Sequence, residues 1–155
     1  MIPSTVKVRS LRMKMFAGAA LSFAMIAGGV LAASPASASG KNINFYSSGW
    51  TNCANHNPND FYCLWYSPGL LNGVWGSTAA GTSTISGSFT QGDGAVRNNA
   101  ASMANDTGNC HVTTWVYPGY TGDYNWLNAF WGGNLTSGSI PLRNNEASIN
   151  TNNCT

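Results

Sequence analysis

Charged side chains are scarce in this sequence. Lys, Arg, Asp and Glu together make up 8% of its 155 residues, and four of its seven basic residues lie before residue 15. The chain after residue 38 keeps three basic residues and all five acidic ones, so its net charge is negative. Because so few Lys and Arg side chains cannot form a stripe that neutralises phosphates, we expect no nucleic-acid partner.

Catalytic signatures are also missing. The sequence contains two histidines in all, and after residue 39 it has no His-Glu-x-x-His, no Gly-x-Ser-x-Gly and no other nucleophile–base set. Its five acidic residues form no recognisable catalytic pair. We therefore expect a protein that is not an enzyme.

Long apolar segments are limited to one. The run from Met15 to Ala33 follows the basic stretch Lys7–Lys14 and precedes Ala36-Ser37-Ala38. A basic start, an apolar middle and a small-residue cleavage site are typical of a secretory signal peptide, with a transmembrane helix as the alternative. We expect residues 1–38 to be removed, the mature chain to be secreted to the extracellular space, and no membrane contact to follow.

A short pattern occurs twice in the remaining chain. Each copy has an aromatic residue, a Pro-Gly turn, a later Gly, an Arg-Asn-Asn segment and a Ser before an apolar residue, in the same order and at nearly the same spacing. These parts predict a folded hairpin built twice. The residues that define the repeat are Trp65, Gly73, Arg97, Asn98, Asn99 and Ser102 in the first copy, and Trp115, Gly122, Arg143, Asn144, Asn145 and Ser148 in the second.

Four cysteines, Cys53, Cys63, Cys110 and Cys154, follow the expected cleavage site. In an exported chain they favour two disulfides over a metal site. Three pairings are possible, and the sequence leaves the choice open. We prefer Cys53–Cys63, which is local, and Cys110–Cys154, which joins the matching ends of the two repeats.

The segments after residue 39 predict strands. Apolar residues do not recur at the helical spacing of three and four over more than two turns. We expect residues 39–60 to form an N-terminal arm and residues 61–155 to form one all-β domain, a Greek-key β-sandwich of two tandem motifs, about 61–110 and 111–155. The strand-like runs are 43–46, 61–66, 74–75, 85–89, the neighbourhood of Met103, 112–117, 124–130 and 148–150.

Specific runs of the chain carry a family resemblance. They are Cys-Leu-Trp-Tyr-Ser-Pro-Gly at Cys63–Gly69, Val-Tyr-Pro-Gly-Tyr-Thr-Gly at Val116–Gly122, and the two Arg-Asn-Asn-x-Ala-Ser segments. From about Cys53 to Cys154 the chain resembles the βγ-crystallin-like fold and, within it, the small secreted metalloproteinase inhibitors of actinobacteria. The four-cysteine layout is also similar to that family.

The βγ-crystallin-like fold implies structural roles for two pairs of small residues. Gly73 and Gly122 stand where the folded hairpin is expected to need a positive φ. Ser102 and Ser148 are expected to place a hydroxyl over the bent hairpin and bond to its backbone.

The inhibitor resemblance implies a partner, an extracellular metallopeptidase, and an inhibitory loop. In the resembled inhibitors the reactive bond follows the third cysteine, which corresponds here to Cys110-His111 with Val112 next. The Cys110–Cys154 bridge would keep such a loop rigid, so that binding costs little entropy. His111 departs from the bulky apolar residue that thermolysin-like peptidases prefer at this place, although an imidazole could approach the active-site zinc.

Calcium is the cofactor that the resemblance to this fold suggests. Many crystallin-like domains bind it through two Asn or Asp, two variable residues, Ser or Thr, then Ser. With Ser102 as the last of these, Arg97 replaces an oxygen ligand and Ala101 a hydroxyl, and the second copy is alike at Arg143 and Ala147. Because calcium needs six or more oxygen ligands, we expect no cofactor, and we expect both arginines to donate to loop carbonyls instead.

Other functions remain open beside inhibition. The chain could be a non-inhibitory secreted module that binds carbohydrate or cell wall, or a killer-toxin-like protein. Trp65 and Trp115, at matching strand positions, are expected in the core, whereas Trp126 and Trp131 are the candidates for an exposed sugar-binding surface. We expect a monomer.

Overall fold

The computed structural model describes residues 37–47, 53 and 56–155. Residues 1–36, most of the expected signal peptide, lie outside the described residues. The described segments contain no helix with the length and apolarity that crossing a membrane requires. The elements are β1 (Gly40–Asn42), β2 (Tyr62–Ser67), β3 (Leu71–Ser77), β4 (Gly81–Thr82), the 3-10 turn η3 (Thr90–Gly92), β5 (Ser102–Asn105), β6 (His111–Tyr117), β7 (Thr121–Leu127), β8 (Gly132–Asn134) and β9 (Ser148–Asn152).

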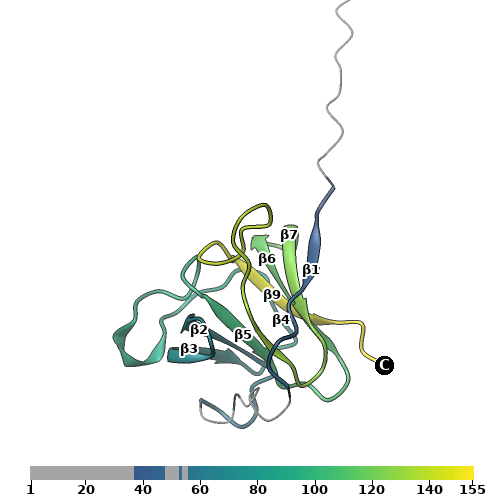
Figure 1. The fold of residues 1–155 in the computed structure, drawn as a ribbon. Coiled ribbons are helices and arrows are strands. Elements are labelled where there is room, and N and C mark those ends of the chain that lie inside the picture. The colour runs from purple at the N-terminus through teal and green to yellow at the C-terminus, as the bar shows by residue number, and fades with distance from the viewer. Residues whose placement is uncertain (1–36, 48–52, 54–55) are drawn as a thin grey trace, which may run out of the picture. The chain divides into compact units, whose positions relative to one another are not determined.

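The strands form two sheets, in the order β1-β7-β6-β9-β4 and β3-β2-β5-β8 (Figure 1). Strand β4 follows the first hairpin in the chain but pairs with β9, and β8 follows the second hairpin but pairs with β5. Each half therefore contributes one strand to the other half's sheet, which ties the halves together. The expected all-β class, two sheets with Greek-key connections, is confirmed.

The two hairpins repeat the same register. Trp65 pairs with Val74 on β3 and with Ser102 on β5, and the ladder shifts between Trp65 and Ser67. The second hairpin has the same pairs and the same shift around Trp115. The duplicated sequence pattern is thus a duplicated backbone geometry.

A serine holds each hairpin closed. The Ser102 hydroxyl donates to the Ser67 carbonyl oxygen at 2.6 Å, and the Ser148 hydroxyl donates to the Tyr117 carbonyl oxygen at 2.6 Å. Each hydroxyl also accepts a backbone N–H from the turn of its own hairpin. Both serines are fully buried, so these bonds are shielded from water.

The expectation of a positive φ is met at Gly122 and wrong at Gly73. Gly122 has a φ of +82°, but the matching residue of the first hairpin is Asn72, with a φ of +65°. Gly73 is required for a different reason, since a Cβ there would lie 2.4 Å from the Thr90 carbonyl oxygen. Its N–H donates to the Asp93 carboxylate at 2.6 Å, so the long insertion of the first repeat packs directly on β3.

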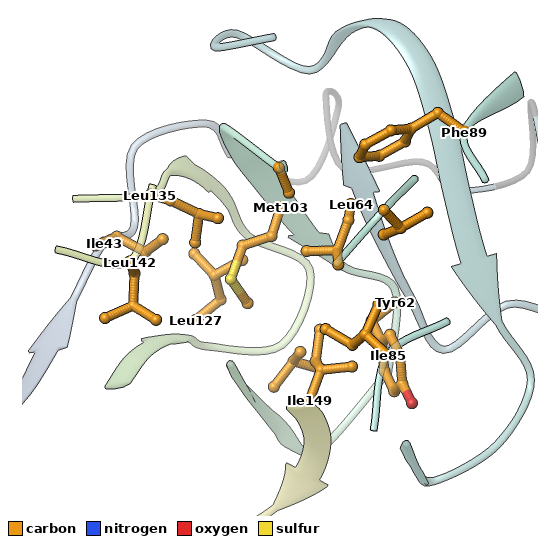
Figure 2. Packing of buried hydrophobic residues seen from close by; sticks show 13 residues of the cluster. Ile43, Tyr62, Leu64, Ile85, Phe89, Met103, Leu127, Leu135, Leu142 and Ile149 are labelled. Atoms are coloured by element: carbon orange, nitrogen blue, oxygen red, sulfur yellow. The ribbon is translucent and has the colours of Figure 1, made fainter. Parts of the chain in front are cut away.

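The main core lies between the sheets (Figure 2). Residues 85–89 do not form the expected strand, yet Ile85 and Phe89 are buried in this core. The apolar residues of this segment therefore reflect burial in the core rather than a place in a sheet. The buried members are Ile43, Tyr62, Leu64, Ile85, Phe89, Val96, Ala100, Met103, Val112, Leu127, Leu135, Leu142 and Ile149.

The disulfides are Cys53–Cys63 and Cys110–Cys154, the two pairs preferred from the sequence. Cys53 is fully buried with Cys63, Trp65 and Ala104 in a second, smaller apolar cluster. The N-terminal arm is therefore held twice: β1 pairs in parallel with β7, and Cys53 is bonded to β2. Two disulfides fit an oxidising compartment such as the extracellular space.

Candidate functional site

The segment expected to be an inhibitory loop is mostly strand. His111 is the first residue of β6 and pairs with Asn152 on β9, and Val112 is fully buried in the core. A peptidase cleft cannot reach a backbone that is paired inside a sheet. Of the three residues predicted, only Cys110 belongs to an irregular segment, the connection between β5 and β6.

That connection, residues 106–110, is here called the braced turn. From inside, the buried Asn105 amide donates to the Cys110 carbonyl at 2.8 Å, and its oxygen accepts the Thr107 N–H at 2.9 Å. From outside, the C-terminal residue Thr155 exchanges two hydrogen bonds with Asn109, both 3.1 Å long. The Cys110–Cys154 bridge adds a covalent tie.

The exposed part of the braced turn is small. Gly108 and Asn109 are exposed, while Thr107 is buried. A shallow hollow beside the turn is lined in part by Phe61, Ala80 and Thr151. The turn therefore offers a short backbone stretch held in one conformation next to an apolar depression.

The two arginines of the repeat do not occupy the positions expected of them. Arg97 and Arg143 are both exposed, and neither guanidinium donates a hydrogen bond to any other residue that the structure describes. The expectation that both arginines donate to loop carbonyls is therefore wrong within the described residues.

A carboxylate, and not an arginine, joins the two Arg-Asn-Asn loops. Glu146 is fully buried; one of its oxygens accepts the N–H groups of Asn99 at 2.9 Å and Ala100 at 2.8 Å, and the other accepts the Asn145 N–H at 3.1 Å. Burial raises the pKa of Glu146 to about 7, against the lowering effect of these backbone hydrogen bonds. The sequence pattern did not single out this residue, since its counterpart in the first repeat is Ala100.

No metal cluster accompanies this loop pair. In the part of the chain that the structure describes, no group of three or more His, Cys, Asp and Glu side chains is placed to hold a metal ion. The Glu146 oxygens already accept backbone N–H groups from both repeats.

The tryptophans divide differently from the expectation. Trp65 is 8% exposed in the small cluster under the arm, as expected of a core residue. Trp115 is half-buried on the outer face of the five-stranded sheet, so its assignment to the core is wrong. Trp126 lies on the same face, whereas Trp131 packs against the main core. The same strand position is thus covered in one repeat and uncovered in the other.

Comparison with known proteins gives structural likeness without a family. No family model matches this chain, and no curated protein matches it. A solved structure described as "Evolution of the eye lens beta-gamma-crystallin domain fold" is similar, with 13% sequence identity and a TM-score of 0.47, over 64% of this chain and 92% of that chain.

Proposed function

We propose that this chain inhibits an extracellular metallopeptidase, and that it does so through the braced turn rather than through a loop at His111 and Val112. The resemblance to secreted inhibitors supplies the target class. The observation that carries the proposal is the bracing of residues 106–110 from both sides, by Asn105 within the domain and by Thr155 at the C-terminus.

Rigidity is what an inhibitory segment needs. A flexible loop loses conformational entropy when a cleft orders it, and this cost reduces affinity. The braced turn has little freedom left to lose, because a disulfide and side-chain hydrogen bonds already hold it. The Cys110 carbonyl, at the end of the turn, is also held by the Asn105 amide.

The size of the exposed segment fits a narrow cleft. Gly108 has no side chain and that of Asn109 is small, so the backbone could enter a groove without a steric barrier. The apolar depression next to the turn, with Phe61 at its edge, would receive the rim of the cleft.

The test is a titration of the mature chain against a panel of zinc peptidases that includes thermolysin, with peptide hydrolysis as the readout. Suppression near one-to-one stoichiometry is the expected result for at least one enzyme. Asn109→Lys, which places a long charged side chain on the turn, should weaken inhibition at least tenfold. Ser139→Lys, an exposed position outside the turn, should not. If the chain inhibited no peptidase of the panel, the proposal would be overturned. Equal inhibition by both variants would show that the braced turn is not the inhibitory segment.

A further inference from the structure

The two sheets have outer faces built from equivalent positions, but the described residues bury only one of the two equivalent tryptophans on these faces. On the four-stranded sheet Cys63, Trp65 and Ala104 are buried beneath the arm with Cys53. By the shared register, the equivalent of Trp65 on the five-stranded sheet is Trp115, which is half-buried. Cys53 is bonded to Cys63 on β2, and in the part of the chain that the structure describes no disulfide joins another segment to a residue of β6.

Four rings line the uncovered face, here called the aromatic face: His111, Trp115, Tyr124 and Trp126. Trp115 and Tyr124 have ring centroids 4.6 Å apart, and His111 and Trp126 stack at 4.7 Å. All four are half-buried. His111 and Trp115 alternate on β6 with the inward-facing Val112, and Tyr124 and Trp126 alternate on β7 with the inward-facing Leu127, so their place on the outside follows from the pleat.

Polar groups without charge surround these rings. The Trp115 indole N–H donates to the Asn150 oxygen at 3.1 Å, and the Asn152 amide donates to the Thr113 hydroxyl at 2.9 Å. A hollow of about 150 Å³ is lined by the four rings with Thr113, Asn152 and Asn153, and none of these residues is Asp, Glu, Lys or Arg. A ligand here meets ring surface together with amide donors and acceptors, and no fixed charge.

We propose that the aromatic face binds neutral glycan chains. A pyranose ring has an apolar face of C–H groups and a rim of hydroxyls. The first packs on aromatic rings, and the second pairs with amides, which both donate and accept. The hollow is smaller than the roughly 300–1,000 Å³ of pockets for drug-sized ligands, so it takes one sugar ring while the chain runs on across the sheet.

A protein partner fits this surface less well. A stable protein interface buries about 800 Å² on each side and has an apolar centre. Here the amides of Asn150 and Asn152 lie among the rings. Charged polymers are disfavoured as well, because the lining offers no counter-charge.

The proposal is tested on the intact mature chain with chitin and cellulose, and with their soluble hexasaccharides followed by tryptophan fluorescence. Wild type should be retained on at least one polymer, and Trp126→Ala should weaken binding at least tenfold. Trp126→Phe, which keeps a ring, should retain most of the binding. Phe45→Ala removes an aromatic side chain that is 73% exposed and lies outside the aromatic face, and it should bind as wild type does.

Thermal unfolding of each variant shows whether a lost signal reflects a lost fold, and Trp126→Phe keeps the test decisive if Trp126→Ala does not fold. No retention of wild type on either polymer would overturn the proposal, as would equal binding by Trp126→Ala. Self-association of wild type that Trp126→Ala abolishes, measured by sedimentation, would also overturn it and assign the face to a second copy of the chain. None of these outcomes depends on peptidase inhibition.

Discussion

The carboxylate of Glu146 accepts the backbone N–H of Ala100 at 2.8 Å, although the two residues occupy the same place in the two repeats. The backbone around them is symmetric: Asn98 donates to the Glu146 carbonyl at 2.9 Å, and Asn144 donates to the Ala100 carbonyl at 2.8 Å. The side chains are not symmetric, because one carboxylate bridges loops that the backbone alone would join by two hydrogen bonds. Glu146 therefore joins the two halves by hydrogen bonds and is also a buried titratable group.

Glu146 should make stability depend on pH. Its pKa in the folded state is raised from 4.5 to about 7, so the folded state holds a proton that the unfolded state has released. The stabilisation is complete below pH 4.5 and is lost as the pH rises through about 7. At about 1.4 kcal/mol per pKa unit, the loss is on the order of 3 kcal/mol.

Urea unfolding at several pH values between 4 and 8 measures this slope. Glu146→Gln keeps an acceptor for Asn99 and Ala100 but cannot ionise, so its stability should be flatter over this range. Glu146→Ala leaves the Ala100 N–H without its acceptor, while the N–H groups of Asn99 and Asn145 keep only the carbonyls of Val96 and Leu142, and the variant should be less stable at every pH, by roughly 1–3 kcal/mol. A wild-type stability that rises between pH 5 and pH 7 in step with ionisation of Glu146 would contradict the assignment.

The two hairpin serines should respond alike to substitution. Ser102→Ala and Ser148→Ala each remove a buried hydroxyl that donates to one backbone group and accepts from another. Each change should cost roughly 1–3 kcal/mol of unfolding free energy, because both backbone partners lose the hydroxyl to which they are bonded. Thr121→Ala, which removes an exposed hydroxyl on the second hairpin, is the control and should stay within about 0.5 kcal/mol of wild type.

Gly73 should tolerate no side chain. A Cβ at Gly73 would meet the Thr90 carbonyl oxygen at 2.4 Å, so Gly73→Ala must push the insertion loop away from β3. We expect a loss of roughly 1–3 kcal/mol. Gly108→Ala meets its nearest neighbour at an ordinary 3.6 Å and should be nearly neutral in thermal unfolding. If the two variants were equally stable, close packing against the insertion would not be what Gly73 provides.

The two disulfides should differ in what they contribute. Cys110–Cys154 spans 44 residues and Cys53–Cys63 spans 10, so the chain-entropy model predicts a larger loss for the first, by about 1 kcal/mol. Paired Cys→Ser variants compared by denaturant unfolding measure this difference. The reverse order would show that covering Trp65 with the arm outweighs the entropy of loop closure.

Local features of the fold could be predicted because their causes are local. The Pro-Gly turns, the alternation in residues 112–117 and the repeated spacing to Ser102 and Ser148 depend on neighbours in sequence, so the hairpins, their serines and the all-β class follow from them. Residues 85–89 have strand composition but form only the isolated bridge between Ser88 and Ala95, and composition alone cannot show how far pairing extends. At the candidate site, the expected loop at Val112 failed because the third cysteine marks the end of a turn rather than its tip.

By itself, the sequence determined a two-fold β architecture with four cysteines after a basic and apolar stretch, since turn chemistry and side-chain alternation act over a few residues. Only the tertiary structure decided which of two equivalent tryptophans is covered. Trp65 and Trp115 have the same strand pairing, but Cys53 packs with Trp65 in the small apolar cluster, whereas Trp115 stays half-buried beside Tyr124. The same holds for Glu146, whose burial and hydrogen bonds come from a loop in the other repeat. Contacts between segments that are distant in sequence do not appear in any local pattern. They bury the tryptophan of one repeat and leave the rings of the other repeat partly exposed.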